Sequence, residues 1–187
     1  MIYLLRHGQT RRNRERLLQG RSDDPLDACG LEEAREAAQR LATVHFDRVF
    51  SSPLTRAIET ARAVVGDDVE ITVDDRLIEM DYGPFEGMSL DAPAPEVLAF
   101  FAYFAHVPAP SGMEQLADVV ARAGSFLEEC CNTQDNILVA THAILMKGML
   151  EYLTPDSHGS FWSKYLGTCE IFVVDRDGDG FSRPVRL

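Results

Sequence analysis

Two histidines stand where an α/β protein could use them for chemistry. His7 follows the apolar run "IYLL" near the start of the chain, and His142 follows the apolar run "ILVA" much later. In open α/β sheets, ligands bind beyond the carboxyl ends of the strands. If both runs are strands of one sheet, the two imidazoles can therefore meet at one edge of it. Either histidine taken alone is more simply read as a loop residue.

The residues beside His7 suit a phosphate group. Arg6 supplies a planar guanidinium whose fork matches phosphate oxygens, and Gly8 has no side chain to keep backbone N–H groups away from an anion. A histidine with an ordinary pKa of about 6.5 is largely neutral near pH 7 and then carries a nucleophilic lone pair. Because a phosphate dianion repels nucleophiles, attack on phosphorus needs cationic donors around it. These residue types therefore fit phosphoryl transfer.

The chain as a whole is acidic, with 30 Asp and Glu against 18 Lys and Arg and a formal net charge of −12. Such a charge argues against nucleic acid or an anionic membrane as partner. The stretch "RHGQTRRNR" from Arg6 to Arg14 is nevertheless strongly cationic. A small anionic ligand would explain this local charge, so we expect a small-molecule phosphate ester as partner.

Neither a leader segment nor a metal site is indicated. Arg6 interrupts the short apolar start "MIYLL", which does not resemble a signal peptide. The four cysteines form no CxxC pair, and His45, His106 and His158 have no partner at metal-ligand spacing. We expect free thiols, a cytoplasmic protein, and no metal ion or other cofactor.

Strand and helix patterns alternate along the chain. Apolar runs predict strands near the positions 1–5, 46–52, 70–75, 136–143 and 169–175. Helical spacing or strong helix formers predict helices over 30–42, 53–65 and 114–131, and an aromatic helix within 91–112. "RDGDGF" after the last strand predicts a hairpin turn.

This alternation predicts an α/β three-layer sandwich with a largely parallel central sheet and a short inserted helical cap. We expect one domain over residues 1–187, with the cap inserted at about 88–113.

Four blocks of the sequence resemble the histidine phosphatase superfamily, the phosphoglycerate-mutase-like enzymes with an RHG signature. In the family's order they are "LLRHGQTRRN" (4–13), "SSPLTRAIETA" (51–61), "LIEMDYGPFEG" (77–87) and "VATHA" (139–143). An RHG tripeptide alone would be weak evidence, whereas four ordered blocks are specific. They cover nearly the whole chain outside the cap.

The resemblance implies that His7 is the nucleophile, which becomes a phosphohistidine, and that Glu79 is the acid and base. It also implies a phosphate pocket lined by Arg6, Asn13, Arg56 and His142. Gln19 and Gly20 follow the first block and are expected to approach the substrate. The chain departs from the family before Gly30, where it reads "LDACG", and at 112–115, where it reads "GMEQ" in place of G-E-S.

Two other motifs resemble known ligand-binding loops but do not fit them. "CGLEEAR" (29–35) matches the C-x₅-R loop of cysteine phosphatases, but its two glutamates would repel a phosphate and its spacing is helical. "DRDGDG" (175–180) resembles the start of a calcium loop, but the twelfth position would be Arg186 in place of a bidentate Glu.

Three functions fit these residues: a phosphomonoesterase for a small metabolite such as α-ribazole phosphate, a sugar phosphate or phosphoglycerate; a cofactor-dependent phosphoglycerate mutase; and a non-catalytic phospholigand sensor. The stretch 77–121 contains no Lys or Arg. In mutases of this family the cap supplies cations for a second anionic group, whereas this cap offers the aromatic "VLAFFAYFA". We therefore expect hydrolysis, unless Arg11, Arg12 or Arg21 supplies the missing charge.

Overall fold

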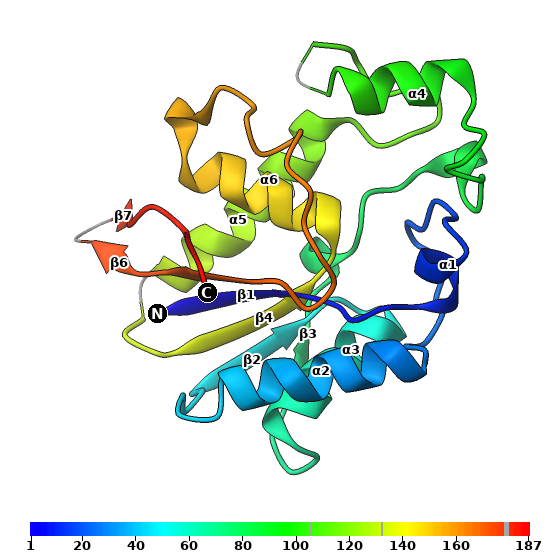
Figure 1. Ribbon diagram of the computed structural model, residues 1–187. Helices are drawn as coiled ribbons and strands as arrows, with labels where there is room; N and C mark the ends of the chain where they lie inside the picture. Colours follow the sequence, from blue (N-terminus) through cyan, green and yellow to red (C-terminus); the bar gives the residue numbers. More distant parts are fainter. Residues whose placement is uncertain (105, 132, 178–179) are drawn as a thin grey trace.

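The computed structural model describes residues 1–104, 106–131, 133–177 and 180–187 (Figure 1). Within these ranges no helix is both long and apolar enough to cross a membrane. The central element is a six-stranded sheet in the order β3-β2-β4-β1-β5-β8. Its strands are β1 (Ile2–Arg6), β2 (Arg48–Ser51), β3 (Thr72–Val73), β4 (Ile137–Thr141), β5 (Ile171–Val174) and β8 (Val185–Arg186).

The sheet is largely parallel, as predicted. β1, β2, β3 and β4 pair in parallel, whereas β5 runs antiparallel to both of its neighbours, β1 and β8. The two central strands are apolar up to their last residues, Arg6 and Thr141, because both of their faces are covered. In β4, for example, every residue is buried. The short edge strand β8 was not predicted.

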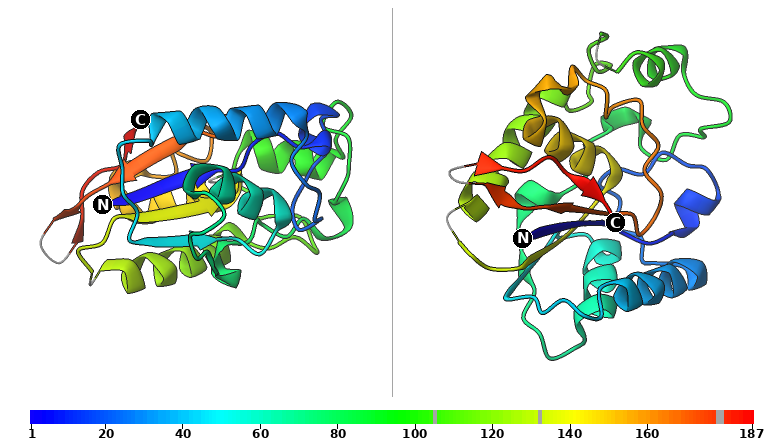
Figure 2. Two further views of the ribbon diagram at one scale, coloured as in Figure 1. Left: turned by 90° about the horizontal axis from the view of Figure 1, so that it is seen from below. Right: turned by 60° about the vertical axis from the view of Figure 1, so that its left-hand side comes forward.

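Helices cover both faces of the sheet, which confirms the three-layer sandwich (Figure 2). α2 (Ala28–Arg40) and α3 (Thr55–Val65) pack against each other on one face, and α5 (Leu116–Cys131) and α6 (Ala143–Leu153) do so on the other. Successive strand residues point to opposite faces. Leu5 of β1 accordingly joins the apolar cluster under α2 and α3, and Leu4 joins the larger cluster under α5 and α6.

Several predicted boundaries move by a few residues, two of them because a side chain caps the start of a helix. α2 begins at Ala28, since the Asp27 carboxylate accepts a hydrogen bond from the Gly30 N–H at 3.0 Å. α3 begins at Thr55, so Pro53 precedes that helix and does not open it. β3 is only two residues long, because the Asp74 side chain accepts from the Arg76 N–H at 2.8 Å and turns the chain into the short 3₁₀ helix η1 (Asp75–Leu77).

The remaining elements are short. α1 (Arg11–Arg14) and α4 (Pro95–Ala102) lie beyond the carboxyl ends of β1 and β4 (Figure 1). Two more 3₁₀ helices are η2 (Gly83–Phe85) and η3 (Pro155–Ser157). β6 (Arg176–Asp177) and β7 (Gly180–Phe181) pair antiparallel, and the predicted hairpin turn between them falls on positions 178–179, outside the described residues. The segment 88–113, which we call the cap segment, contains α4.

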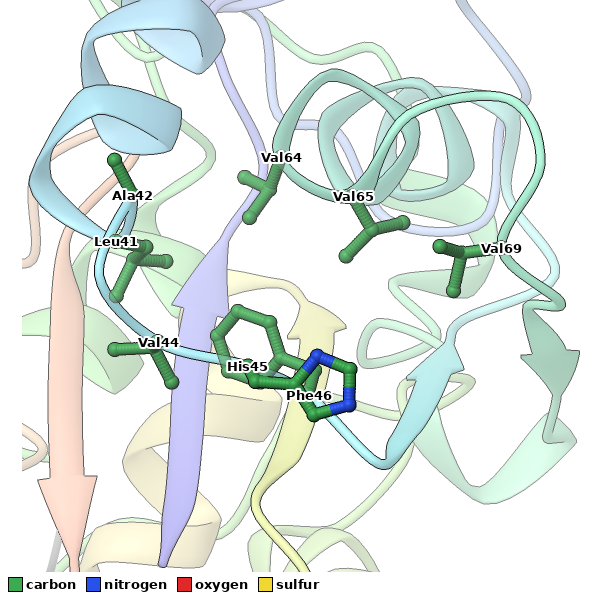
Figure 3. Close-up of a pocket in the computed structure, with 8 residues that line it drawn as sticks. All are labelled: Leu41, Ala42, Val44, His45, Phe46, Val64, Val65 and Val69. Carbon is green, nitrogen blue, oxygen red and sulfur yellow. The ribbon is translucent and has the colours of Figure 1, made fainter.

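An apolar hollow lies at the opposite end of the sheet from α1 and α4. It is formed where α2 and α3 end, and it encloses about 180 Å³ (Figure 3). Its lining residues are Leu41, Ala42, Val44, His45, Phe46, Val64, Val65 and Val69. These segments flank the start of β2, so this hollow is remote from the strand ends that carry His7 and His142.

Candidate active site

The sheet brings His7 and His142 together. β1 and β4 are parallel neighbours in which Arg6 pairs with Thr141, so the next residue of each strand falls at the same edge. The His7 N–H donates to the Thr141 carbonyl at 2.9 Å. The two imidazole rings lie with their centroids 5.1 Å apart, and both side chains are buried.

Hydrogen bonds fix the tautomer of His7. Its Nδ1 lies 2.7 Å from the Gly8 carbonyl oxygen, which can only accept, so Nδ1 carries the proton. Nε2 then holds the lone pair and accepts a hydrogen bond from Nε of Arg56 at 3.3 Å. Burial, reinforced by the charges of Arg56 and Arg6, lowers the pKa of His7 well below its ordinary value. His7 is therefore a neutral imidazole with its lone pair on Nε2.

Arg56 is held rigidly at the base of the site. It lies in the first turn of α3 and has no exposed surface. Its Nη1 donates to the Ser22 carbonyl and its Nη2 to the Gly20 carbonyl, each at 2.7 Å. Burial lowers the pKa of Arg56 to about 10, so the guanidinium is still a cation at neutral pH. The loop 20–22 thus orients a fixed positive charge toward His7.

Arg6 and His142 each have a buried nitrogen without a hydrogen-bond partner in the described part of the chain. Arg6 donates from Nη1 to the Leu166 carbonyl, but its Nε is unpaired. His142 Nε2 lies 2.7 Å from the Ser52 hydroxyl, and Nδ1 is unpaired. Burying such groups without a partner is costly, and in native proteins it often marks a functional site.

The Ser52 hydroxyl suggests which nitrogen of His142 is protonated. Its oxygen accepts from the Leu54 N–H at 3.3 Å, so its own hydrogen is free to donate to His142 Nε2. When Ser52 donates in this way, Nδ1 of His142 carries the ring proton and is a donor. Together with Nε of Arg6, it supplies a second N–H that a phosphate oxygen can accept from.

Glu79 is held at the amino end of α6. Its Oε1 accepts from the N–H groups of Met80 at 2.9 Å and Leu145 at 3.1 Å, and its Oε2 accepts from the Ile144 N–H at 3.1 Å. His142 is the N-cap residue of α6 and makes no capping bond with its side chain. Glu79 supplies that cap instead, with its carboxyl group at the amino end of the helix. In the described part of the chain Oε2 accepts one hydrogen bond, from Ile144, and keeps a further lone pair.

Asn13 and Gln19 make their observed contacts within the loop that follows β1. The Asn13 Oδ1 accepts from the N–H and the hydroxyl of Thr10, both at 3.1 Å, in a capping box for α1. The Gln19 Oε1 accepts from the Thr10 hydroxyl at 2.7 Å, and its Nε2 donates to Asp24 at 3.4 Å. Gly20 orients Arg56, as described above. These three residues shape the loop that follows β1.

Gly8 has a different role from the predicted one. A Cβ at Gly8 would lie 2.5 Å from the carbonyl oxygen of Gly30, so the loop after β1 and the start of α2 could not approach so closely. The Gly8 N–H donates to the Thr60 hydroxyl at 3.1 Å, so it does not face an anion. Thr60 and Ser52 were not predicted as site residues, although both lie in the block 51–61, and Ser52 directly follows β2.

Glu114 gives the departing "GMEQ" stretch a structural role. Its Oε1 accepts from Nε of Arg122 at 2.8 Å, and its Oε2 accepts from the Asp81 N–H at 3.0 Å and pairs with Arg21 at 3.4 Å. The Asp81 carbonyl accepts from the Glu114 N–H at 2.9 Å. The stretch 112–115 is therefore fastened to the segment that carries Glu79.

The cysteine motif at 29–35 is not a phosphate loop. It lies in α2, and Glu33 of that helix accepts from the Gln9 N–H at 2.7 Å. Cys29, Cys130 and Cys169 are free thiols. Within the described ranges there is no cluster of three or more His, Cys, Asp or Glu side chains that could hold a metal ion.

Most cations near the site are neutralised by carboxylates. Arg11 pairs with Glu15 at 2.9 Å, Arg12 with Asp24 at 2.6 Å, and Arg21 with Asp81 at 3.3 Å. No carboxylate within salt-bridge distance of Arg6 or Arg56 is found among the described residues. The positive charge available to a ligand is thus concentrated on these two arginines beside His7.

A buried neutral imidazole that follows Arg6 in the chain and accepts a hydrogen bond from Arg56, at the carboxyl edge of a mostly parallel sheet, defines an α/β protein with an anion site suited to phosphate. The chain belongs to the histidine phosphatase superfamily (branch 1), whose family profile matches residues 2–184. Among similar sequences, the fructose-2,6-bisphosphatase TIGAR of Xenopus tropicalis is 40% identical over 140 residues, which is 70% of this chain. The matched part is 49% of that relative, about half of its length.

Solved structures of phosphatases share the whole fold. A phosphoserine phosphatase from Entamoeba histolytica, crystallised with 3-phosphoglyceric acid, superposes with a TM-score of 0.84 at 26% identity and covers 100% of this chain and 94% of its own. The α-ribazole phosphatase from Shigella flexneri gives a TM-score of 0.85 at 26% identity and covers 99% of this chain and 95% of its own.

Proposed function

We propose that this protein is a phosphomonoesterase that hydrolyses a small phosphorylated metabolite through a phosphohistidine on His7. The proposal rests on the orientation of the His7 ring, which leaves the lone pair on Nε2. The hydrogen bond from Nδ1 to the Gly8 carbonyl fixes this orientation, and Nε of Arg56 lies 3.3 Å from Nε2. The phosphatase names of the relatives support the same reaction class.

In the first step, the Nε–H of Arg56 turns from Nε2 of His7 to a phosphoryl oxygen. The freed Nε2 lone pair attacks phosphorus, and the bond from phosphorus to the ester oxygen breaks. Glu79, in its protonated form, gives its proton to that oxygen as the alcohol leaves. The phosphoryl oxygens accept hydrogen bonds from Arg56, from Nε of Arg6 and from Nδ1 of His142, the last two being the unpaired buried nitrogens. Asn13 completes this set through its amide nitrogen. Positive charge around phosphorus stabilises the transition state.

In the second step, a water molecule attacks the phosphohistidine. The Glu79 carboxylate takes a proton from that water, the P–N bond breaks, and His7 regains its lone pair while inorganic phosphate leaves. Glu79 is thus returned to its protonated form for the next cycle. Gln19 and Gly20 lie in the loop that fixes Arg56, and we place them at the substrate side of the pocket.

Hydrolysis is favoured over mutase activity because the cations near the pocket are engaged. A mutase must hold a second anionic group while the sugar acid reorients, and an unpaired second charge in a partly dry site is costly. The stretch 77–121 has no Lys or Arg. Arg11, Arg12 and Arg21 are each paired with a carboxylate.

The function is tested by phosphate release from a panel of monoesters, run in the presence of EDTA. The panel includes phosphoserine, phosphoglycerate, sugar phosphates, α-ribazole phosphate and p-nitrophenyl phosphate. Rapid acid-free quenching with a labelled substrate should trap an adduct that is labile in acid and stable in alkali. His7→Ala should form none, and His45→Ala, an exposed histidine far from the site, should behave as wild type. An adduct that persists in His7→Ala would refute the assignment of the nucleophile.

The alternative functions give different results in the same preparation. With 2,3-bisphosphoglycerate added, we expect little interconversion of 2- and 3-phosphoglycerate. Mutase turnover above hydrolysis would contradict the phosphatase assignment. Tight phosphate binding without turnover of any monoester would instead favour a sensor.

A further inference from the structure

Lys147 is a buried cation that the proposed reaction does not use. It lies in α6, five residues after His142, and is 9% exposed. Its Nζ donates to the Trp162 carbonyl at 2.8 Å. No carboxylate within salt-bridge distance of this ammonium is found in the described ranges. Burying an unpaired charge is unfavourable, so its placement calls for a specific role.

The Lys147 ammonium joins three elements. It belongs to α6, it bonds to Trp162 of the segment 158–166, which we call the roof segment, and it lies 5.4 Å from the ring centroid of Phe104 in the cap segment. The Trp162 and Phe104 rings are themselves stacked, with centroids 6.1 Å apart. One charged group therefore sits where helix, roof segment and cap segment meet.

Each of these elements also reaches the candidate active site. The amino end of α6 carries His142 and binds Glu79 through the Ile144 N–H. In the roof segment, the Leu166 carbonyl accepts from Arg6. The cap segment packs Phe101 edge-on against Tyr82, three residues after Glu79, with centroids 6.2 Å apart.

We propose that Lys147 is a positioning residue that fixes the cap segment and the roof segment over the phosphate pocket and thereby sets the affinity for the ester. This inference rests on the proposed phosphatase function. The charge matters because a hydrogen bond from a charged donor to a buried carbonyl is stronger than one from a neutral donor. The ammonium also attracts the face of the Phe104 ring. Lys147 acts through these contacts and takes no part in the transfer of the phosphoryl group.

The charge on Lys147 can be removed at a mildly alkaline pH. Burial lowers the pKa of Lys147 to about 8, with Glu79 raising it and Arg6 lowering it further. His106 and His158 line the cavity beside Phe104 and Trp162. As pH rises past about 8 the ammonium loses its proton, its contacts weaken, and KM should rise.

The test compares Lys147→Met and Lys147→Arg with a matched control. Lys164→Met removes an exposed lysine of the same roof segment, whose Nζ lies 4.0 Å from the Phe161 ring centroid. With the best monoester of the panel at pH 7, Lys147→Met should raise KM about tenfold to a hundredfold, the range that a charged hydrogen bond supplies. The kcat should change by less than about threefold in this variant.

The conservative variant and the pH profile separate positioning from a general loss of structure. Lys147→Arg should keep KM near the wild-type value, and the rise of KM above about pH 8 should vanish, because guanidinium stays charged there. Lys147→Met should show a high KM at every pH. If Lys147→Met does not fold, the pH profiles of KM for the wild type and for Lys147→Arg still test the positioning role.

Hydrogen exchange gives a readout that needs no activity. Lys147→Met should speed amide exchange in α4 and in the roof segment and leave β1 and β4 protected. The proposal is overturned if Lys147→Met matches Lys164→Met in KM and exchange. It is also overturned if kcat falls at constant KM, or if KM rises only for esters with a second anionic group, since Lys147 would then contact substrate directly. A wild-type protein that hydrolyses no monoester, with the exchange result as expected, would refute the function and leave the positioning role.

Discussion

The phosphate pocket and the cap segment are held by different kinds of interaction. In the pocket, charged and polar side chains bond to backbone atoms: Arg56 to two carbonyls, and Glu79 to three N–H groups. In the cap segment, aromatic rings pack on one another, as between Phe100 and Phe104, whose centroids are 4.8 Å apart. Directional bonds fix atoms in place, whereas apolar contact tolerates a change of shape.

This difference separates chemistry from selectivity. Under the proposed function, the pocket would bind the phosphoryl group, which is the same in every monoester, and the cap segment would face the part of the ester that varies. Two large apolar side chains of the cap segment, Leu98 and Tyr103, are more than half exposed. Substitutions in the pocket should therefore affect every substrate, and substitutions in the cap segment should affect them unequally.

The largest effect is expected from Arg56→Met. The change removes the cation beside Nε2 and leaves the carbonyls of Gly20 and Ser22 without their donor. We expect kcat/KM to fall by about 10³-fold and the free energy of unfolding by about 3 kcal/mol. Steady-state kinetics and urea denaturation measure the two losses.

Arg11→Met is the matched control for that change. Arg11 is 57% exposed and forms a surface pair with Glu15, so its loss should cost less than about 0.5 kcal/mol. Equal losses in the two variants would show that the pocket is no more rigid than the surface.

Glu79→Gln should slow turnover of alkyl phosphates by about 10²-fold, because an amide cannot donate and retake the proton. The loss should be smaller for p-nitrophenyl phosphate, whose leaving group hardly needs protonation. In this variant the new amide NH₂ also meets a backbone N–H where a carboxylate oxygen had accepted a hydrogen bond. Thermal unfolding therefore has to be measured beside the kinetics, to separate a loss of stability from a loss of chemistry. Equal losses for both substrates would mean that Glu79 only holds the amino end of α6.

His7 should resist protonation as the pH falls. Because burial lowers its pKa in the folded state, the unfolded chain binds the proton more readily, and the free energy of unfolding should decline as pH drops below about 6.5. Ring resonances in NMR spectra should report a neutral His7 well below that pH. A His7 that titrates near 6.5 would show that the pocket is open to water.

The smallest effect is expected from Leu98→Gln in the cap segment. The side chain is 57% exposed, and Gln is a comparable helix former. Stability should change by less than about 0.5 kcal/mol, and kcat for p-nitrophenyl phosphate should be unchanged. A large loss of kcat would break the division between pocket and cap segment.

Much of the architecture follows from local sequence pattern. The apolar runs before His7 and His142 predicted strands buried on both faces, and alternation with helices predicted the parallel sheet that places both residues at one edge. Local capping was underestimated, as at Asp27 and Asp74, because a side-chain bond two or three residues away shifts an element's start without changing the apolar pattern.

The amino-acid sequence by itself determined which residue types stand at the strand ends, because the apolar runs and the order of the four blocks can be read from neighbours along the chain. Only the tertiary structure decided the proton on Nδ1 of His7, the contact of Gly8 with Gly30, and the burial of Lys147. The first result depends on the backbone conformation at Gly8, the residue after His7, and the other two depend on the packing of segments that are distant in the sequence. None of the three leaves a periodic trace in the sequence.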